Sequence, residues 1–280
     1  MTRVPLEVHI KPVERLVFRG EVSAIGSFRC AVSHPLFRDS GPCSHHTFVF
    51  PRTSTEIRHD GGARFIGTPN SISFYNEGQR YSRTAVSASD DSDWYMVADD
   101  VLVDVVSRYD ARVDERRPFR FAVGPSDARL YLEQRRLFDN VASFDALAVD
   151  ESVLRLLDRA VAAAHRANAR ELVRRSDADV VAAAQRTLVA RVDENMNLRE
   201  LASNAGVSPF RLCRIFRART GMTLTRFRHD LRLRAALDRV RATTDLSALA
   251  HDLGYASHSH FTAHFRRRFG VTPSAMRART

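Results

Sequence analysis

The sequence predicts an α+β protein with a β-rich N-terminal part and an all-helical C-terminal part. Runs of β-branched and aromatic residues alternate with turn residues in the first third, whereas apolar residues recur at helical spacing from about residue 126. A short motif is also repeated near the C-terminal end. The length of 280 residues suits about two domains, and 44% hydrophobic residues can form their cores.

The first 125 residues read as β structure. The runs lie at residues 47–50, 63–66, 71–75 and 93–97. Glycine, proline and asparagine residues between them are typical of tight turns. We therefore expect a small barrel or sandwich over residues 1–125.

Residues 126–176 are predicted to form a helical connector. Apolar residues at helical spacing indicate two helices, roughly over residues 126–143 and 150–168, whose faces could equally form the seam of a homodimer. The polar stretch 174–179 then resembles a short linker that ends on an N-cap. After it we expect a helix over residues 180–192.

Composition limits where the protein is found. No apolar stretch reaches the 18 residues of a membrane span, and the first ten residues lack the apolar core of a secretion signal. We therefore expect a cytoplasmic protein. Three cysteines, Cys30, Cys43 and Cys213, are too few to staple a chain of this length, so we expect reduced thiols.

The positive charge is concentrated near the C-terminal end. Residues 197–280 hold 16 arginines against five acidic residues, while the preceding 196 residues carry a net charge of −1. Lys11 is the single lysine, so nearly every cation is a guanidinium group, which suits bidentate phosphate contacts. A basic terminal domain is the electrostatic footprint of a polyanion, most often nucleic acid.

This basic part contains an internal repeat. Residues 201–208 (LASNAGVS) align with residues 249–256 (LAHDLGYA) at an offset of 48, and a second apolar-periodic helix follows each copy. Glycine supplies the positive φ of a three-residue turn, and Ser208 with Pro209, or Ser257, can begin the following helix. Two tandem copies predict two helix-turn-helix motifs, whose second helices can enter a major groove of DNA.

The second copy contains a longer set of motif residues. They are Leu249-Ala250, Gly254-Tyr255, Phe261, Phe265-Arg266-Arg267, Gly270, Thr272-Pro273-Ser274 and Arg277. Together with Arg232 and Ala235 before them, these residues resemble the DNA-binding domain of the AraC/XylS family of transcriptional regulators. The resemblance covers residues 177–280. It implies sequence-specific binding to double-stranded DNA and contact with RNA polymerase.

The resemblance also implies which side chains face DNA. The recognition helices would span about residues 208–219 and 257–268, with Arg214 contacting guanine. The base-reading residues would be Phe210, Arg211, Cys213, Arg214, His258, Ser259, Thr262 and Ala263. The phosphate ligands would be Arg217, Arg226, Arg266, Arg267 and Arg268. Many family members have arginine at the position of Ala263, so we expect the second helix to read bases weakly and to act through phosphates and DNA shape.

The N-terminal part resembles the cupin-like sensor domains of this family. The resemblance rests on the strand pattern, the domain order and three short motifs at residues 50–52, 74–76 and 81–83. A barrel of this size can hold one small effector. Its aromatic lining would be Phe48, Phe50, Phe65, Phe74, Tyr75, Tyr81 and Trp94, unless these side chains are plain core.

Potential metal ligands gather within one N-terminal stretch. Cys30, His34, Cys43 and His45, with His46 beside them, carry the thiolate and imidazole groups that zinc prefers. Their spacing matches no standard zinc finger, and the ligand pattern of a cupin enzyme is absent from the sequence. We therefore expect no cofactor and keep these four residues as the candidates for a metal site.

Three functions remain open at this stage. The favoured one is a one-component transcriptional regulator that a small effector controls. The alternatives are a metal-dependent cupin enzyme with an accessory DNA-binding tail, and an architectural DNA binder without a ligand. The sequence contains no Gly-rich phosphate loop, Gly-x-Ser-x-Gly elbow or HExxH motif, so we expect no enzyme.

Overall fold

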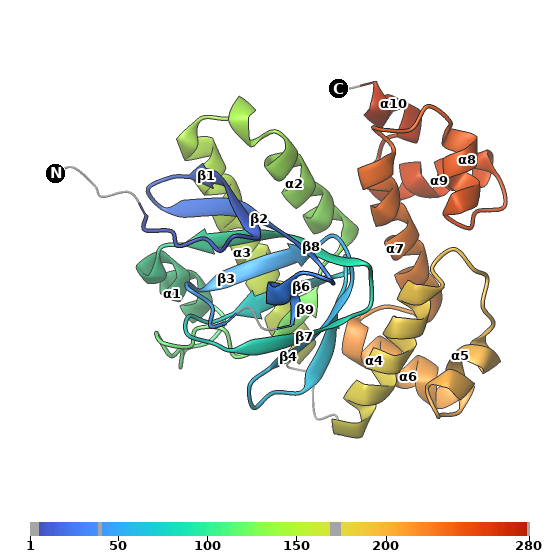
Figure 1. The fold of residues 1–280 in the computed structure, drawn as a ribbon, viewed down its shortest axis with the longest axis horizontal. Helices are drawn as coiled ribbons and strands as arrows, with labels where there is room; N and C mark the ends of the chain where they lie inside the picture. Colours follow the sequence, from blue (N-terminus) through green and yellow to red (C-terminus); the bar gives the residue numbers. More distant parts are fainter. Residues whose placement is uncertain (1–5, 39–40, 169–174, 279–280) are drawn as a thin grey trace. The chain divides into compact units, whose positions relative to one another are not determined.

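The computed structural model describes residues 6–38, 41–168 and 175–278. The chain divides into two compact units, Met1–Val173 and Arg174–Thr280. The first contains all the strands of the described residues and the second contains only helices (Figure 1). The predicted α+β class, with β structure before helices, is confirmed.

Two antiparallel sheets form the frame of the N-terminal unit. The larger has the strand order β1-β2-β8-β3-β6-β9 and the smaller has the order β5-β4-β7. The strands are β1 (Glu14–Arg19), β2 (Ser23–Ala31), β3 (Thr47–Pro51), β4 (Thr55–His59), β5 (Arg64–Gly67), β6 (Ser71–Tyr75), β7 (Tyr81–Ala85), β8 (Ser89–Val97) and β9 (Val123–Pro125). The four predicted runs correspond to β3, β5, β6 and β8.

Helices of the same unit pack on one face of the larger sheet. They are α1 (Asp99–Ser107), α2 (Ala128–Asp139) and α3 (Ala146–Asn168). Helix α3 approaches β9 so closely that a Cβ atom on Gly124 would lie 2.7 Å from the Cβ atom of Ala164. Phe48 and Phe50 point to this face and contact Tyr95, with ring centroids 5.3 and 5.7 Å apart. One hydrophobic core of the unit lies here, between the larger sheet and the helices.

A buried carboxylate ties the sheet to α2. Asp93 on β8 has no exposed surface and accepts hydrogen bonds from Arg52 Nε at 2.9 Å and from Gln134 Nε2 at 2.8 Å. Arg29 Nη2 also donates to it, at 3.1 Å. A buried charge that is paired in this way is strongly destabilising to break, because the partners then remain buried and uncompensated.

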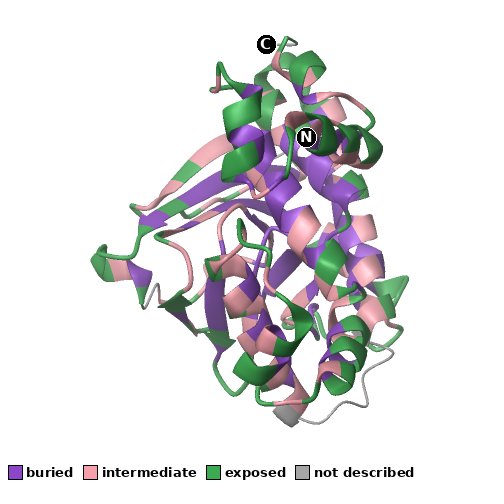
Figure 2. Cartoon of the chain, turned by 90° about the vertical axis from the view of Figure 1, so that its right-hand side faces the viewer, coloured by how far each residue is buried: buried purple, intermediate pink, exposed green. Residues whose placement is uncertain are grey.

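The described residues of the second unit form seven helices, of which α4 and α7 are the longest. They are α4 (Arg175–Ala190), α5 (Leu198–Asn204), α6 (Pro209–Thr220), α8 (Leu246–Asp252), α9 (His258–Phe269) and α10 (Pro273–Arg277), and α7 spans Leu224–Arg239. Val181, Ala184 and Leu188 of α4 join one core with Leu212 and Phe216 of α6. In Figure 2 several helices carry buried residues on one side and exposed residues on the opposite side.

Two expectations for the helices were wrong. The stretch 174–179 is not a linker, because α4 begins at Arg175; residue 174 itself lies outside the described residues. The helix extends this far because Ala178 is buried in the core, which outweighs the polar character of its neighbours. Helix α1 lies in the part expected to be β structure, although Leu102, Val105 and Val106 show the i, i+3, i+4 spacing of a buried helix face.

Candidate nucleic-acid interface and ligand cavity

The first repeat folds as a helix-turn-helix motif. Helix α5 ends before Gly206, whose φ of +67° lies in the left-handed region. The Ser208 hydroxyl accepts a hydrogen bond from the backbone N–H of Arg211 at 3.3 Å, and Pro209 occupies the first turn of α6. The helix ends at Gly221, with a φ of +70°. The predicted turn and cap are therefore confirmed.

Helix α6 presents a basic face to solvent. Leu212, Ile215 and Phe216 are buried in the core, which turns the opposite side of the helix outward. The exposed residues include Phe210, Arg211, Cys213, Arg214 and Arg217, and Phe210 is 80% exposed. Four base-reading candidates and one phosphate candidate thus share one accessible face. One of them, Arg211, already contacts Asp177 at 3.1 Å.

The second repeat has the same local geometry. The turn between α8 and α9 contains Gly254 at φ +73°, and the Ser257 hydroxyl accepts a hydrogen bond from His260 N–H at 3.1 Å. Phe261, Phe265 and Phe269 are buried, and each ring packs on the next at 5.6 and 4.8 Å. The four candidates on this helix are Ser259 and Ala263, which are exposed, and His258 and Thr262, which are partly buried.

The five phosphate candidates differ in their surroundings. Arg217, Arg226, Arg266 and Arg267 are exposed. In contrast, Arg268 donates a hydrogen bond to Asp230 on α7, whose side chain is only 4% exposed. This pair fixes α9 to α7, so we assign Arg268 a structural role rather than a phosphate contact. Arg226 lies 3.8 Å from the same carboxylate.

A buried arginine joins the two repeats. In the sequence it was noted only as one of the residues that resemble the family, and its structural role was not predicted. Arg232 on α7 is 2% exposed and donates to three backbone carbonyls, those of Val192 at 2.5 Å, Glu194 at 3.0 Å and Gly254 at 2.9 Å. The first two lie between α4 and α5 and the third lies in the turn of the second motif. Arg232 therefore links the turn of the second motif to the support of the first.

Histidines cluster beside the second recognition helix. His229 on α7 stacks on His264 of α9 with ring centroids 5.0 Å apart, and His260 contacts His264 at 4.6 Å. Burial, followed by repulsion from His264 and nearby arginines, lowers the pKa of His229 to about 4. His229 is therefore neutral near pH 7 and adds no permanent positive charge to this surface.

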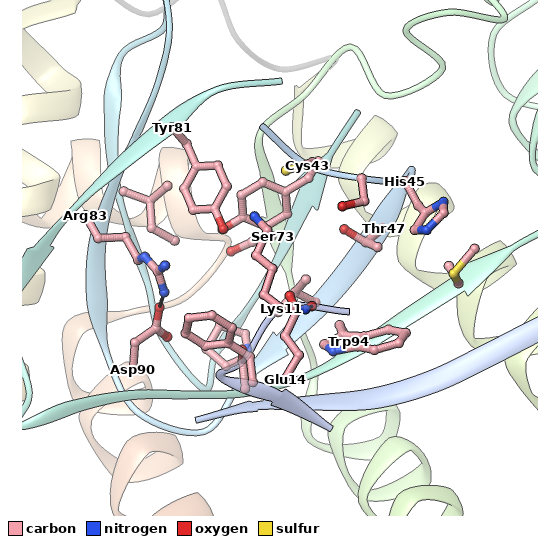
Figure 3. A pocket seen from close by; sticks show the side chains of 18 of the residues that line it. Lys11, Glu14, Cys43, His45, Thr47, Ser73, Tyr81, Arg83, Asp90 and Trp94 are labelled. Carbon is pink, nitrogen blue, oxygen red and sulfur yellow. Dashed lines mark hydrogen bonds and ion pairs between the residues drawn. The ribbon is translucent and has the colours of Figure 1, made fainter. Parts of the chain in front are cut away.

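A cavity of about 80 Å³ lies between the two sheets of the N-terminal unit. Its lining includes Val49, Ser73 and Trp94 of the larger sheet and Ile57 and Arg83 of the smaller (Figure 3). Burial is the largest cause of the raised pKa values of Tyr75 and Glu14, which also line it.

Only part of the predicted aromatic lining faces this cavity. Tyr75, Tyr81 and Trp94 line it, whereas Phe48, Phe50 and Phe74 are buried elsewhere and Phe65 packs against His59 at 5.4 Å. The reason is strand alternation, because residues i and i+2 share a face and i+1 does not. On β3 the cavity residues are Thr47, Val49 and Pro51, so the sequence signal that would have found them is spacing and not aromaticity.

The four candidate metal ligands occupy different environments. Cys30 is buried in a core cluster, His34 caps a short 3-10 helix, and Cys43 and His45 line the cavity. Across residues 6–38, 41–168 and 175–278, no three His, Cys, Asp or Glu side chains are grouped so that they could hold a metal ion. The structure thus brings two of the four to one cavity and leaves the other two apart.

Two tandem helix-turn-helix motifs with basic outward faces define a DNA-binding protein. A helix-turn-helix domain family model matches residues 201–279. The regulatory protein SoxS of Escherichia coli K12 is 37% identical over 89 residues, which is 31% of this chain and 83% of SoxS. The transcriptional activator RhaS of Pectobacterium carotovorum is 32% identical over 85 residues, 30% of each chain. The chain belongs to the AraC/XylS family and is a DNA-binding transcriptional regulator.

The comparison with solved structures gives matches over part or most of the chain. An AraC-type regulator from Chromobacterium violaceum is 26% identical, with a TM-score of 0.34, over 36% of this chain and 90% of its own. ToxT from Vibrio cholerae is 10% identical, with a TM-score of 0.38, over 91% of this chain and 97% of ToxT.

Among the residues described, no helix combines the length and apolar character needed to cross a membrane.

Proposed function

We propose that the two recognition helices divide the work of binding one asymmetric DNA site. Helix α6 reads base edges, because guanidinium groups lie along its exposed face. Helix α9 acts mainly on the phosphate backbone, because Ala263 and Ser259 are short and the exposed arginines, Arg266 and Arg267, lie in its last turn. The difference between these two exposed faces is the observation that carries the proposal. Successive major grooves about 34 Å apart would receive the two helices.

The remaining parts of the proposal concern regulation. Residues 1–125 would be a cupin-like sensor whose cavity binds a small effector, residues 126–176 would mediate homodimer formation, and residues 177–280 would bind DNA. We also infer that the protein acts in the cytoplasm and contacts RNA polymerase at its promoters. The cavity between the two sheets and the amphipathic helices α2 and α3 support the first two of these roles.

Variants at two arginines test the division between α6 and α9. Binding sites are first selected from a random DNA pool, and affinity is then measured by gel shift for each single-base change. Arg214→Ala should weaken binding by about 1 to 3 kcal/mol and relax the preference at one base pair. Arg267→Ala should weaken binding to all sequences alike and make binding less dependent on salt. Arg58→Ala, an exposed arginine on β4, is the control.

Two results would contradict this division. One is a uniform loss of affinity in both variants without any change in base preference. The other is a weak dependence of the wild-type affinity on salt, since neutralising about 6 to 8 phosphates gives a steep one. Effector control is tested separately, by measuring operator affinity while candidate small molecules are titrated. An affinity that no ligand alters favours the ligand-independent architectural role.

A further inference from the structure

Phe210 is the most exposed large apolar side chain among the described residues. It is 80% exposed, and the next most exposed, Leu147, is 70% exposed. Single exposed apolar residues are common on protein surfaces and need no explanation by themselves. The position of Phe210 sets it apart, because it follows the Ser208 cap and Pro209 in the first turn of the recognition helix α6.

Helical spacing places Phe210 on the arginine-rich side of α6. Residues three, four and seven positions apart share one side of a helix, so Phe210 lies in line with Cys213, Arg214 and Arg217. All four side chains are exposed, and the opposite side of the helix is buried in the core. The exposed stripe therefore begins with an aromatic ring and continues with guanidinium groups.

The guanidinium group next to Phe210 in the sequence is already engaged. Arg211 Nη2 donates a hydrogen bond to Asp177 Oδ1 at 3.1 Å, and only 16% of the Asp177 side chain is exposed. Asp177 lies in the first turn of α4, so this contact draws Arg211 toward the supporting helix. In the first turn of α6, Phe210 is therefore the large side chain that is left to meet base edges.

The major groove offers one apolar partner for such a ring. Its base edges present hydrogen-bond donors and acceptors at every step, and the C5 methyl group of thymine is their apolar feature. Against a phosphate, a phenylalanine ring would displace water from charged oxygen atoms without replacing the lost hydrogen bonds, which is costly. Against a methyl group, it buries apolar surface on both partners, which is favourable.

Helix geometry then sets the distance between two contacted base pairs. Phe210 and Arg214 are four residues apart, which is a rise of about 6 Å along the helix. Base pairs follow each other about every 3.4 Å along DNA, so two such side chains reach positions about one or two base pairs apart.

We infer that Phe210 is a specificity-determining residue that packs on the C5 methyl group of a thymine, one or two base pairs from the guanine that Arg214 contacts. The inference rests on the base-reading role proposed for α6 and names a second base that this helix requires.

Replacing thymine by uracil tests the inference, because the two bases differ only in the C5 methyl group. A site is first selected from random DNA with the full chain, and Arg214→Ala identifies the guanine in it. Each thymine is then replaced singly by deoxyuridine. At a thymine one or two base pairs from that guanine, gel shift should show about fourfold weaker binding, the loss expected for one buried methyl-sized group.

Phe210→Ala identifies the side chain that contacts this methyl group. The variant should bind the thymine site about tenfold less tightly than wild type, because most of the ring is lost from the interface. It should bind the thymine and uracil sites with equal affinity. Since Phe210 is 80% exposed in the free protein, the change should leave thermal unfolding unaltered, so a loss of affinity reports the interface.

Two further variants control the comparison. Phe144→Ala makes the same change at a phenylalanine of the N-terminal unit that is 49% exposed. Arg217→Ala should weaken binding through a phosphate contact on the same helix as Phe210. Both variants should keep the preference of about fourfold for thymine over uracil, because neither loses the ring that contacts the methyl group.

Each outcome decides a different point. A selected site without thymine near the guanine, equal affinity for the thymine and uracil sites in wild type, or a preference for thymine that Phe210→Ala retains would overturn the inference and leave the contact of Arg214 with guanine intact. Loss of the preference in Phe144→Ala or Arg217→Ala would also overturn it. If selection yields no preferred sequence, or Arg214→Ala changes no base preference, the base-reading role of α6 fails and the inference fails with it.

Discussion

The two helix-turn-helix motifs share a backbone design but differ in how their turns are packed. Gly206 and Gly254 have nearly equal φ angles, +67° and +73°. A Cβ atom on Gly206 would meet nothing within 4 Å, whereas one on Gly254 would lie 1.9 Å from the carbonyl oxygen of Asp193. The first turn is therefore free of close contacts, and the second packs tightly against Asp193, in the segment between α4 and α5. Repeated sequence does not imply repeated roles in packing.

The motifs also differ in the chemistry of their exposed faces. Helix α6 exposes arginines along the side that carries its base-reading candidates, and α9 exposes the short side chains of Ser259 and Ala263 there. The hydrogen bonds of Arg232 to backbone carbonyls include one in the turn of the second motif, and the pair of Arg268 with Asp230 also involves this motif. We therefore expect the second motif to be the more sensitive in stability and the first to be the more sensitive in base preference.

The largest difference is expected between the two turn glycines. Both alanine variants lose about 1 to 2 kcal/mol because the left-handed backbone strains a side chain. Gly254→Ala adds a clash with backbone, so its total should exceed about 4 kcal/mol. Urea unfolding followed by far-UV circular dichroism measures both, and Trp94 emission reports the N-terminal unit separately. Equal losses would show that the close contact with Asp193 relaxes at little cost.

The next largest loss of stability is expected at Arg232, which hydrogen-bonds to three backbone carbonyls. Arg232→Met removes three hydrogen bonds from a buried guanidinium group to backbone carbonyls and should cost about 3 kcal/mol in the free energy of unfolding of the C-terminal unit. Arg239→Met, on the same helix, is the matched control. Its side chain is half exposed and pairs with exposed Asp252, so the change should stay within about 0.5 kcal/mol. Similar values for the two variants would remove Arg232 as the link between the motifs.

The caps should behave alike in both motifs. Ser208→Ala and Ser257→Ala each remove one side-chain acceptor from a helix N-terminus, and each should cost about 1 kcal/mol. Thermal unfolding of the two single variants and of the double variant measures this, with additive losses expected. A cost for one cap that is several times larger than for the other would indicate that the caps, like the turns, have diverged.

The smallest effect is a pH dependence confined to the second motif. The pKa of His229 is lowered in the folded protein. This imidazole therefore stays neutral at pH values at which the same group in the unfolded chain takes up a proton. The stabilisation is complete above the ordinary value of 6.5 and is lost as the pH falls toward about 4. The groups facing His229 include His264, His260, Arg228 and Arg232. His229→Gln should flatten the fall in stability between these pH values.

A matched exposed histidine controls that measurement. His251→Gln on α8, which removes an exposed imidazole from the same motif, is the control variant. Denaturant unfolding at several pH values compares the three proteins. Profiles that fall equally in wild type and His229→Gln would place the pH sensitivity on other groups.

Local patterns predicted more of the C-terminal unit than of the N-terminal one. Turn glycines, capping serines and apolar spacing are all short-range signals, so both motifs were located to within about one residue. The pair of Arg268 with Asp230 spans 38 positions, and no local pattern distinguishes it from a solvent-exposed arginine. The first residues of α4 were predicted to be a linker because the burial of Ala178 depends on helices that follow later in the chain.

Residue type and spacing by themselves determined the class of this protein, the two tandem motifs and their basic character, because each depends on neighbours within a few turns of helix. Tertiary structure decided which aromatic side chains face the cavity, which arginines remain exposed and which turn is wedged. Those properties depend on strand register and on contacts between distant segments. Both are settled only when the whole chain has packed.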